Sequence, residues 1–175
     1  ELTQEIRDRF MKAEPAAIGH YIARGFMRPE IKPVCDEMKV VGPAYTVRLN
    51  ERDSSALYYA IQKAPKGSVI VVDRAGDHTF ACVGEFFAEI TRALGMAGIV
   101  IDGPATDKLA LKRMGFPVFC TGFSPVTEKI TEIGVMKLQD GRVIDEFSCF
   151  VNPEKPIPAR VVELTGITDD KVRDA

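Results

Sequence analysis

Residues 81–122 alternate segments that favour a helix with segments that favour a buried strand, and this pattern restricts the possible folds more than any other part of the chain. From Phe86 to Leu94 the apolar residues recur at helical spacing, and Gly95 supplies a stop signal. Residues 98–101 then form a short run of apolar residues, which is typical of a buried strand. The sequence therefore predicts a helix that leads into a strand of an internal sheet.

The same order of elements follows once more. Thr106 and Asp107 suit a helix start, Gly115 ends that helix, and residues 117–120 form a second apolar run. Two strands joined by a helix run parallel, because such a crossover is almost always right-handed. We therefore expect an α/β fold built from βαβ units.

Polar residues gather at the predicted ends of these elements. A turn at Gly84 that opens a helix leaves backbone N–H groups free to bind a carboxylate or an enolate, and Glu85-Phe86-Phe87 follow it. Asp102 and Asp107 fall at the carboxyl end of a strand and at the next helix start, where ligands collect in parallel sheets. Carboxylate oxygens there suit Mg²⁺ or Mn²⁺. In the simpler alternative, Asp102-Gly103 is a plain turn and Asp107 only begins a helix.

Five segments carry a recognisable pattern, in order and with matching spacing. They are Gly-Pro-Ala-Tyr-Thr-Val at 42–47, Gly-Ser-Val-Ile-Val-Val-Asp at 67–73, Gly-Glu at 84–85, Gly-Met-Ala-Gly-Ile-Val-Ile-Asp-Gly at 95–103 and Phe-Pro-Val-Phe at 116–119. Together they resemble the RraA-like family, which includes 4-hydroxy-4-methyl-2-oxoglutarate aldolases and protein regulators of ribonuclease E. The resemblance covers roughly residues 5–126 and implies an RraA-like layered α/β sandwich, a small 2-oxo acid as substrate, and a homo-oligomer, either a trimer or a hexamer, with sites near subunit contacts.

The resemblance also implies roles for individual residues. Asp107 would place the divalent metal, Mg²⁺ or Mn²⁺, and the backbone of Gly84-Glu85-Phe86-Phe87 would face the substrate carboxylate. The family's aldolases carry an Arg-Asp pair where this chain has Thr106-Asp107. The missing arginine removes a charged hydrogen bond worth roughly 1.5–3 kcal/mol. Arg74, in a loop expected to be solvated, is the cation to consider in its place.

We therefore expect a metal-dependent lyase-type site for aldol cleavage or decarboxylation, with Glu85, Asp102 and Asp107 as catalytic candidates and Thr106 beside the substrate. Glu85 or a bound water would carry the proton, unless Glu85 only neutralises the helix N-terminus. The alternative is a regulatory or binding protein that kept the fold and lost the chemistry. A third reading is a nucleic-acid module formed by the C-terminal segment.

The rest of the first 126 residues supplies further elements. Apolar residues at helical spacing within 6–22 predict two helices divided by Pro15, and residues 40–47 predict a strand interrupted near Gly42-Pro43. Residues 57–64 predict an amphipathic helix, and residues 69–72 predict a third buried strand.

Composition limits the class of protein. The 175 residues suffice for one domain, or one domain and a fragment, and a net charge of −2 argues against a large nucleic-acid surface. No apolar run approaches the roughly 18 residues of a membrane helix and no signal-peptide pattern occurs, so we expect no membrane association and a cytoplasmic protein. The four cysteines and the two histidines show no metal-binding spacing.

Residues 127–175 form the second of two expected domains, after residues 1–126. From Lys129 on they resemble part of the proofreading exonuclease domain of PolC-type DNA polymerase III. Asp140-Gly141 predicts a hairpin turn, and residues 161–164 predict a short helix closed by Gly166. Such nucleases hold two metal ions through an Asp-x-Glu motif, which this sequence lacks, so the segment is expected to be non-catalytic. A natural fusion, a gene-prediction error and a designed chimera would each give such a chain.

Overall fold

The computed structural model describes residues 2–49, 54–127, 132–139, 142–150, 156–157, 159, 162 and 167–174, the strands within 132–150 by their backbone alone. The chain forms two compact units, Glu1–Glu128 and Lys129–Ala175. Each unit is described separately below.

The first unit is built on a five-stranded sheet in the order β1-β6-β4-β3-β2. Its strands are β1 (Lys32–Pro33), β2 (Ala44–Arg48), β3 (Val69–Asp73), β4 (Gly98–Asp102) and β6 (Val118–Cys120). The pairs β2·β3, β3·β4 and β4·β6 are parallel, as the sequence predicts, and β1 runs antiparallel to β6. The register aligns Asp73 with Asp102, so these carboxylates end neighbouring strands.

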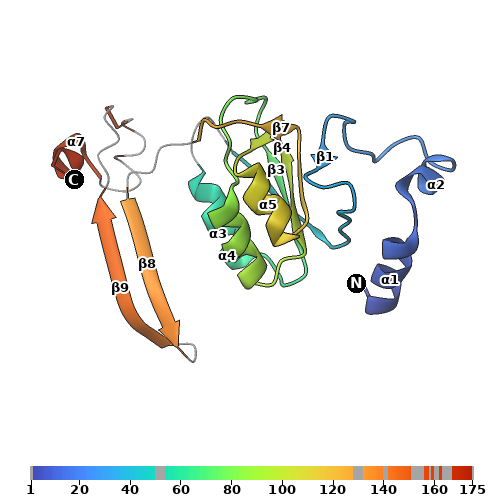
Figure 1. Cartoon of the computed structure of the whole chain (residues 1–175), viewed down its shortest axis with the longest axis horizontal. Helices are drawn as coiled ribbons and strands as arrows, with labels where there is room; N and C mark the ends of the chain where they lie inside the picture. The colour runs from blue at the N-terminus through green and yellow to red at the C-terminus, as the bar shows by residue number, and fades with distance from the viewer. Residues whose placement is uncertain are drawn as a thin grey trace. The chain divides into compact units, whose positions relative to one another are not determined.

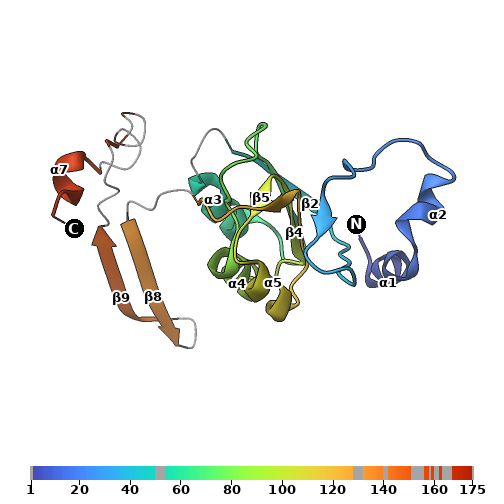
Figure 2. The same cartoon turned by 45° about the horizontal axis from the view of Figure 1, so that its top comes forward.

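Three helices connect the parallel strands. They are α3 (Ser55–Lys63), α4 (Glu85–Ala93) and α5 (Lys108–Met114). The parallel strands stand side by side in chain order, and right-handed crossovers that all advance in one direction place their helices on one face of the sheet. Figures 1 and 2 show α3, α4 and α5 together on that face.

The main core lies between the helices and the sheet. It consists mostly of small and branched apolar side chains, which fill the space between a helix layer and a parallel sheet closely. The largest fully buried members are Leu49, Leu57, Ile70, Ile99, Ile101, Leu111, Val72, Val83 and Val118. Phe87 of α4 packs edge-on against Tyr58 of α3, with 5.3 Å between ring centroids. The alternation of helix and strand thus becomes one continuous apolar layer.

One expected boundary in the first unit shifts, and three short strands were not expected. The strand expected over residues 40–47, with an interruption near Gly42-Pro43, begins only at Ala44, because Pro43 has no N–H to donate. The sequence also failed to predict the short strand β1 and the pair β5 (Pro104–Ala105) and β7 (Gly122–Phe123), which form a separate two-stranded parallel sheet. Strands of two residues carry too little periodicity to be recognised.

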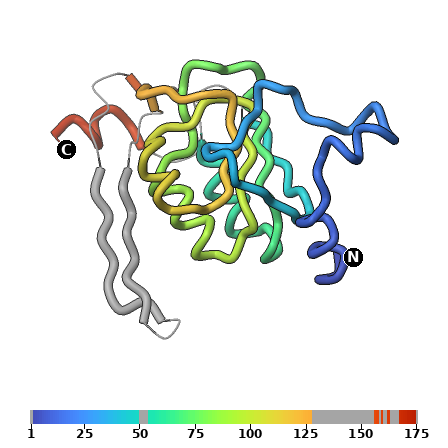
Figure 3. Tube along the Cα trace, turned by 45° about the vertical axis from the view of Figure 1, so that its right-hand side comes forward, coloured from blue at the N-terminus to red at the C-terminus, as the bar shows by residue number. Residues whose placement is uncertain are grey.

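An N-terminal arm carries α1 (Gln4–Lys12) and α2 (Pro15–Gly19), with Pro15 at the first turn of α2, as expected. The tube in Figure 3 can be followed from this arm into the sheet. Arg7 donates to the carbonyl of Val41 at 2.7 Å, and Lys39 pairs with Glu14 at 3.5 Å. Within the described part of the chain, no helix is long and apolar enough to cross a membrane.

The second unit contains the antiparallel strands β8 (Glu132–Gln139) and β9 (Arg142–Phe150) and the helix α7 (Asp169–Val172). The predicted hairpin is therefore present, with an irregular register between Lys137 and Leu138. Ile157, Ile167 and Val172 form a small buried cluster. The turn expected at 140–141 and most of the helix expected at 161–164 lie outside the described residues.

Candidate functional site

Gly84 is the N-cap of α4, so the helix begins where the sequence places it. Its backbone is extended, and the N–H groups of the first helical turn have no acceptor within the helix. A Cβ at this position would lie 2.3 Å from the Oδ2 atom of Asp107 and 2.7 Å from the Cγ2 atom of Thr106. Only a glycine therefore allows the start of α4 to approach these two residues so closely.

Asp107 faces the start of α4. The backbone N–H of Glu85 donates to the Oδ2 atom of Asp107 at 3.0 Å. Asp107 itself adopts a left-handed backbone with φ of 52° and ψ of 41°, which only a minority of non-glycine residues do. Its exposed carboxylate thus occupies the positive end of the α4 dipole while remaining open to solvent.

Thr106 joins the two segments of the site through its backbone. Its N–H donates to the carbonyl of Val83 at 2.9 Å, and its hydroxyl lies 3.5 Å from the Oδ1 atom of Asp107. Directly before Thr106, β5 pairs with β7. The structure therefore brings together Gly84, Glu85, Thr106 and Asp107 from two loops separated in sequence.

Asp102 has a different partner. Its carboxylate forms an ion pair with the guanidinium of Arg28 from the N-terminal arm, and both side chains are partly exposed. The chain turns at Gly103 and runs through β5 before it reaches Asp107. Asp102 therefore lies at the expected end of β4, in contact with a cation that the sequence did not single out.

The apolar residues near the site divide into two groups. Phe87 is 3% exposed and belongs to the core, so only its backbone N–H can face a ligand. Phe86 and Leu109 are 67% and 72% exposed on the first turns of α4 and α5. The start of each helix thus presents a large apolar side chain to solvent.

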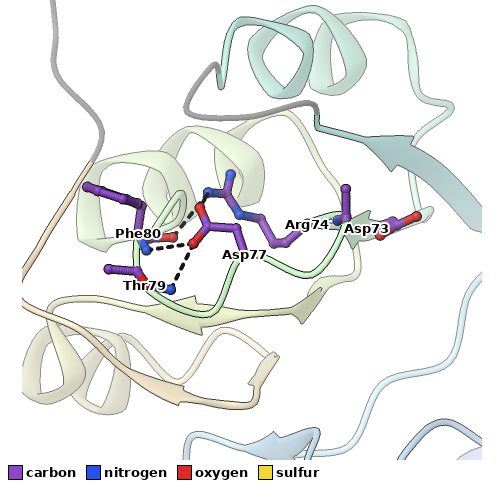
Figure 4. Close-up of polar contacts among 6 residues, drawn as sticks. Asp73, Arg74, Asp77, Thr79 and Phe80 are labelled. Atoms are coloured by element: carbon purple, nitrogen blue, oxygen red, sulfur yellow. Dashed lines mark hydrogen bonds and ion pairs between the residues drawn. The ribbon is translucent and has the colours of Figure 1, made fainter.

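Arg74 is buried, although the loop that it begins is mostly exposed, as expected. It is 1% exposed, and its guanidinium donates to the Oδ2 atom of Asp77 at 2.6 Å and to the carbonyl of Phe80 at 3.2 Å (Figure 4). The loop can fold over the guanidinium because Ala75 and Gly76 both have positive φ. The Arg74 guanidinium is thus held by residues of its own loop. It is unsuited to replace the arginine of the family's Arg-Asp pair.

Asp77 closes this loop. Desolvation by burial raises the pKa of Asp77, but hydrogen bonds from the N–H groups of Thr79 and Phe80 and the nearby Arg74 guanidinium outweigh it. The net effect is a pKa below the ordinary value of 3.8, so Asp77 is ionised at neutral pH.

A hollow of about 440 Å³ lies beside Arg28. It is lined by Arg28, Glu30, His78, Pro104, Thr121, Gly122 and Phe123. None of the catalytic candidates is among these lining residues. Arg28 and His78 are functional candidates that sequence spacing did not reveal, because they come from loops 50 residues apart in number and meet only in the fold.

Near Asp107, few protein atoms could bind a divalent ion directly. Within the described residues, no three His, Cys, Asp or Glu side chains are grouped as a metal cage. Mg²⁺ commonly binds through one or two carboxylates and keeps several waters, so the single exposed carboxylate of Asp107 fits that mode. Glu85 and Thr106 lie beside it and could contact those waters.

Comparison with known proteins reveals two similarities of different extent. A protein of Halalkalibacterium halodurans, provisionally named as a 4-hydroxy-4-methyl-2-oxoglutarate aldolase, is 37% identical over 138 residues. These residues are 79% of this chain and 62% of that relative, so the chain spans less than two thirds of its length. The PolC-type DNA polymerase III of Bacillus subtilis is 47% identical over 60 residues, which are 34% of this chain and 4% of the polymerase.

Solved structures share the fold. Streptomyces coelicolor RraAS2, described as an unusual member of the RNase ES inhibitor RraA family, has a TM-score of 0.61 and 27% identity. That match covers 71% of this chain and 67% of RraAS2. The RNA-processing inhibitor RraA of Thermus thermophilis has a TM-score of 0.59 at 19% identity, over 67% of this chain and 71% of that protein, which shows the fold alone.

The family comparison covers most of the sequence. The model of the RraA-like family, described as Aldolase/RraA, matches residues 3–151 and so includes the hairpin of β8 and β9. With a match of that extent and an RraA fold in the sheet unit, the chain belongs to the RraA-like family.

Proposed function

We propose that this protein is a divalent-metal-dependent lyase for a small 2-oxo acid, acting by aldol cleavage or decarboxylation at the start of α4. The observation that carries the proposal is the contact between the N–H of Glu85 and the carboxylate of Asp107, with no space for a side chain at Gly84. An exposed carboxylate beside a helix N-terminus combines a ligand for a hard cation with donors for an anion.

Different groups of the chain would bind the substrate carboxylate, stabilise the developing charge and transfer the proton. Asp107 already accepts the N–H of Glu85, which leaves the N–H groups of Phe86 and Phe87 for the substrate carboxylate. The same donors, near the positive end of the helix dipole, would favour the negative charge that develops as the C–C bond breaks. Glu85, exposed beside them, is placed to hold or return a proton.

Mg²⁺ or Mn²⁺ held near Asp107 would supply Lewis acidity toward the 2-oxo group. The hydroxyl of Thr106 lies beside that carboxylate but is neutral, so it cannot form the two charged hydrogen bonds of an arginine. The proposed site therefore binds a substrate carboxylate mainly through backbone donors, and we expect weaker substrate binding than an Arg-Asp pair would give.

The test is the Asp107→Asn variant. We expect Mg²⁺ to raise the melting temperature of the wild-type protein and to have no effect on the variant, because the amide removes the charge that holds the ion. The Asp73→Asn variant is the matched control, since Asp73 ends the neighbouring strand and is half-exposed beside Arg48. Calorimetric Mg²⁺ binding that is equal in wild type and Asp107→Asn would remove Asp107 from the site.

A second candidate function is regulatory binding without catalysis. It is favoured by Thr106 at the position of the family arginine and by the likeness to RraAS2, which is described as a member of an RNase inhibitor family. This candidate predicts no turnover of oxaloacetate or 4-hydroxy-4-methyl-2-oxoglutarate with Mg²⁺ or Mn²⁺, together with binding of a protein partner. Turnover that depends on Asp107 would decide for the lyase.

A further inference from the structure

Arg74 is a charged residue in the protein interior, where charged residues are rare. Among the residues whose burial the structure describes, Arg74 is the only charged one in the buried class, with 1% of its surface exposed. Burial of an unpaired guanidinium would be very costly, so such a residue persists where partners fix it in place. Its partners therefore indicate what it holds.

The guanidinium holds the loop that precedes the site. It pairs with Asp77 at 2.6 Å and donates to the carbonyl of Phe80 at 3.2 Å. Asp77 in turn accepts the N–H groups of Thr79 and Phe80 at 2.8 and 3.2 Å. Figure 4 shows the guanidinium and the Asp77 carboxylate both beside the backbone of Phe80. The carboxylate binds the N–H of Phe80 and the guanidinium binds its C=O group.

From Phe80 the constraint passes along four residues to Gly84. The N–H of Ala81 donates to the carbonyl of Val126 at 2.8 Å, and the carbonyl of Val83 accepts the N–H of Thr106 at 2.9 Å. These bonds leave the segment little freedom. The hydrogen bonds of Arg74 and Asp77 with Phe80 therefore help to fix the position of the start of α4.

The stem of Arg74 also touches the second segment of the site. A Cβ at Gly103 would lie 2.6 Å from the Cγ atom of Arg74 and 3.2 Å from the carbonyl oxygen of Asp77. Gly103 follows Asp102 and leads through β5 to Thr106 and Asp107. One buried side chain is thus in contact with both segments that carry the proposed site.

We propose that Arg74, locked by Asp77, is a positioning residue that sets the approach of the Gly84 segment to Thr106 and Asp107. This inference rests on the proposed function for its catalytic consequence, although the structural part does not. Arg74 touches no substrate. It acts by keeping the α4 donors and the Asp107 carboxylate at their observed separation, on which a reaction that needs both depends steeply.

The structural part is tested by native-state hydrogen exchange of the whole chain, read at two amides. The Thr106 N–H spans the two segments, whereas the Ile99 N–H, bonded to the carbonyl of Pro117 at 2.9 Å, reports on the sheet core. In Arg74→Lys and Asp77→Asn we expect exchange at Thr106 to accelerate at least about tenfold, with Ile99 changed less than about twofold. Lysine keeps the charge, but its side chain is one atom shorter and lacks the planar guanidinium whose Nη2 atom donates to both Asp77 and Phe80.

The control is Arg48→Gln. Arg48 pairs with Asp73 at 3.5 Å but is 70% exposed, so its loss should change neither amide. Equal acceleration at Thr106 and Ile99 in the Arg74 and Asp77 variants would show a general loss of stability and overturn the proposal. An unchanged Thr106 would overturn it too. Arg74→Lys and Asp77→Asn are conservative changes, so the comparison can be made on folded protein.

The catalytic part is tested by oxaloacetate decarboxylation with Mg²⁺, at a temperature where every variant is folded. We expect kcat/KM to fall about tenfold or more in Arg74→Lys and Asp77→Asn and to stay at the wild-type value in Arg48→Gln. If all folded variants have the kcat/KM of the wild type, Arg74 has a structural role alone, and the proposal that it positions the site for catalysis is overturned. A wild type without turnover would refute the lyase proposal, and the exchange data would still decide whether Arg74 positions the segment.

Discussion

At the scale of single residues, Gly84 and Asp107 depend on each other. The sequence predicts that one helix starts at Gly84 and the next at Asp107. The left-handed backbone of Asp107, however, follows from no local signal. Asp tolerates that conformation without requiring it, so the surroundings select it. The residue types at the site were therefore predictable, whereas their close approach was not.

This dependence predicts the effect of Gly84→Ala. A methyl group at 2.3 Å from Asp107 Oδ2 must push the carboxylate away, so we expect a loss of roughly 1–3 kcal/mol in the free energy of unfolding, typical of overpacking. Chemical denaturation measures it. Gly122→Ala is the control, because a Cβ there meets nothing within 4 Å. Equal stabilities of the two variants would contradict the observed packing.

A second residue-scale prediction concerns Thr106→Arg. An arginine beside Asp107 restores the charged clamp of the family's Arg-Asp pair, so we expect Mg²⁺-dependent cleavage of oxaloacetate to appear or to rise about tenfold. Steady-state kinetics measure kcat/KM for both proteins. A wild type that already matches the variant would show that Thr106 is no defect.

At the scale of elements, the sequence predicts the strands and helices that carry long apolar periodicity. The starts of α4 and α5 and the carboxyl ends of β3 and β4 fall where the pattern places them. The loop after β3 is mostly exposed, as its charges suggest, but the fold buries the Arg74 side chain in it. The hydrogen bonds that hold Arg74 lie within its own loop, to Asp77 and Phe80, and no pattern of apolar residues encodes them.

The same loop predicts a dependence of stability on pH. The pKa of Asp77 is lowered in the folded protein, so its stabilising effect is full above the unfolded value of 3.8 and is lost as pH falls through the folded pKa. We expect Asp77→Asn to unfold more easily than wild type at pH 6 and to approach it near pH 3. Urea titrations at several pH values check this. A stability difference that is independent of pH would mean that Asp77 does not act through its charge.

At the scale of the whole molecule, the C-terminal segment has two kinds of relative. The family match runs to residue 151 and includes the hairpin, while the polymerase similarity covers 60 residues, equal to 34% of the chain. The absence of an Asp-x-Glu motif from the sequence still predicts no nuclease activity. The expected division at residue 126 stays a prediction.

Removal of residues 129–175 tests that segment. A two-stranded hairpin is marginal alone in water, and the family match covers it together with the sheet unit, so we expect removal of the segment to lower the melting temperature by a few degrees. Scanning calorimetry of a chain ending at Glu128 measures the change. An unchanged melting temperature would show that the segment contributes nothing to the sheet unit. Metal-dependent release of nucleotides from single-stranded DNA by the whole chain alone would refute the expected lack of nuclease activity.

The pairing of β1 with β6 has a consequence for the order of events on the ribosome. Strands β3, β4 and β6 can each join the parallel neighbour synthesised just before, so this part of the sheet can grow as the chain emerges. Lys32 and Pro33 leave the ribosome first of all the strands, yet their partners Phe119 and Cys120 follow more than 80 residues later. The earliest strand to be translated is therefore the last of the five to find its place, and the N-terminal arm must wait for nearly the whole sheet unit to be made.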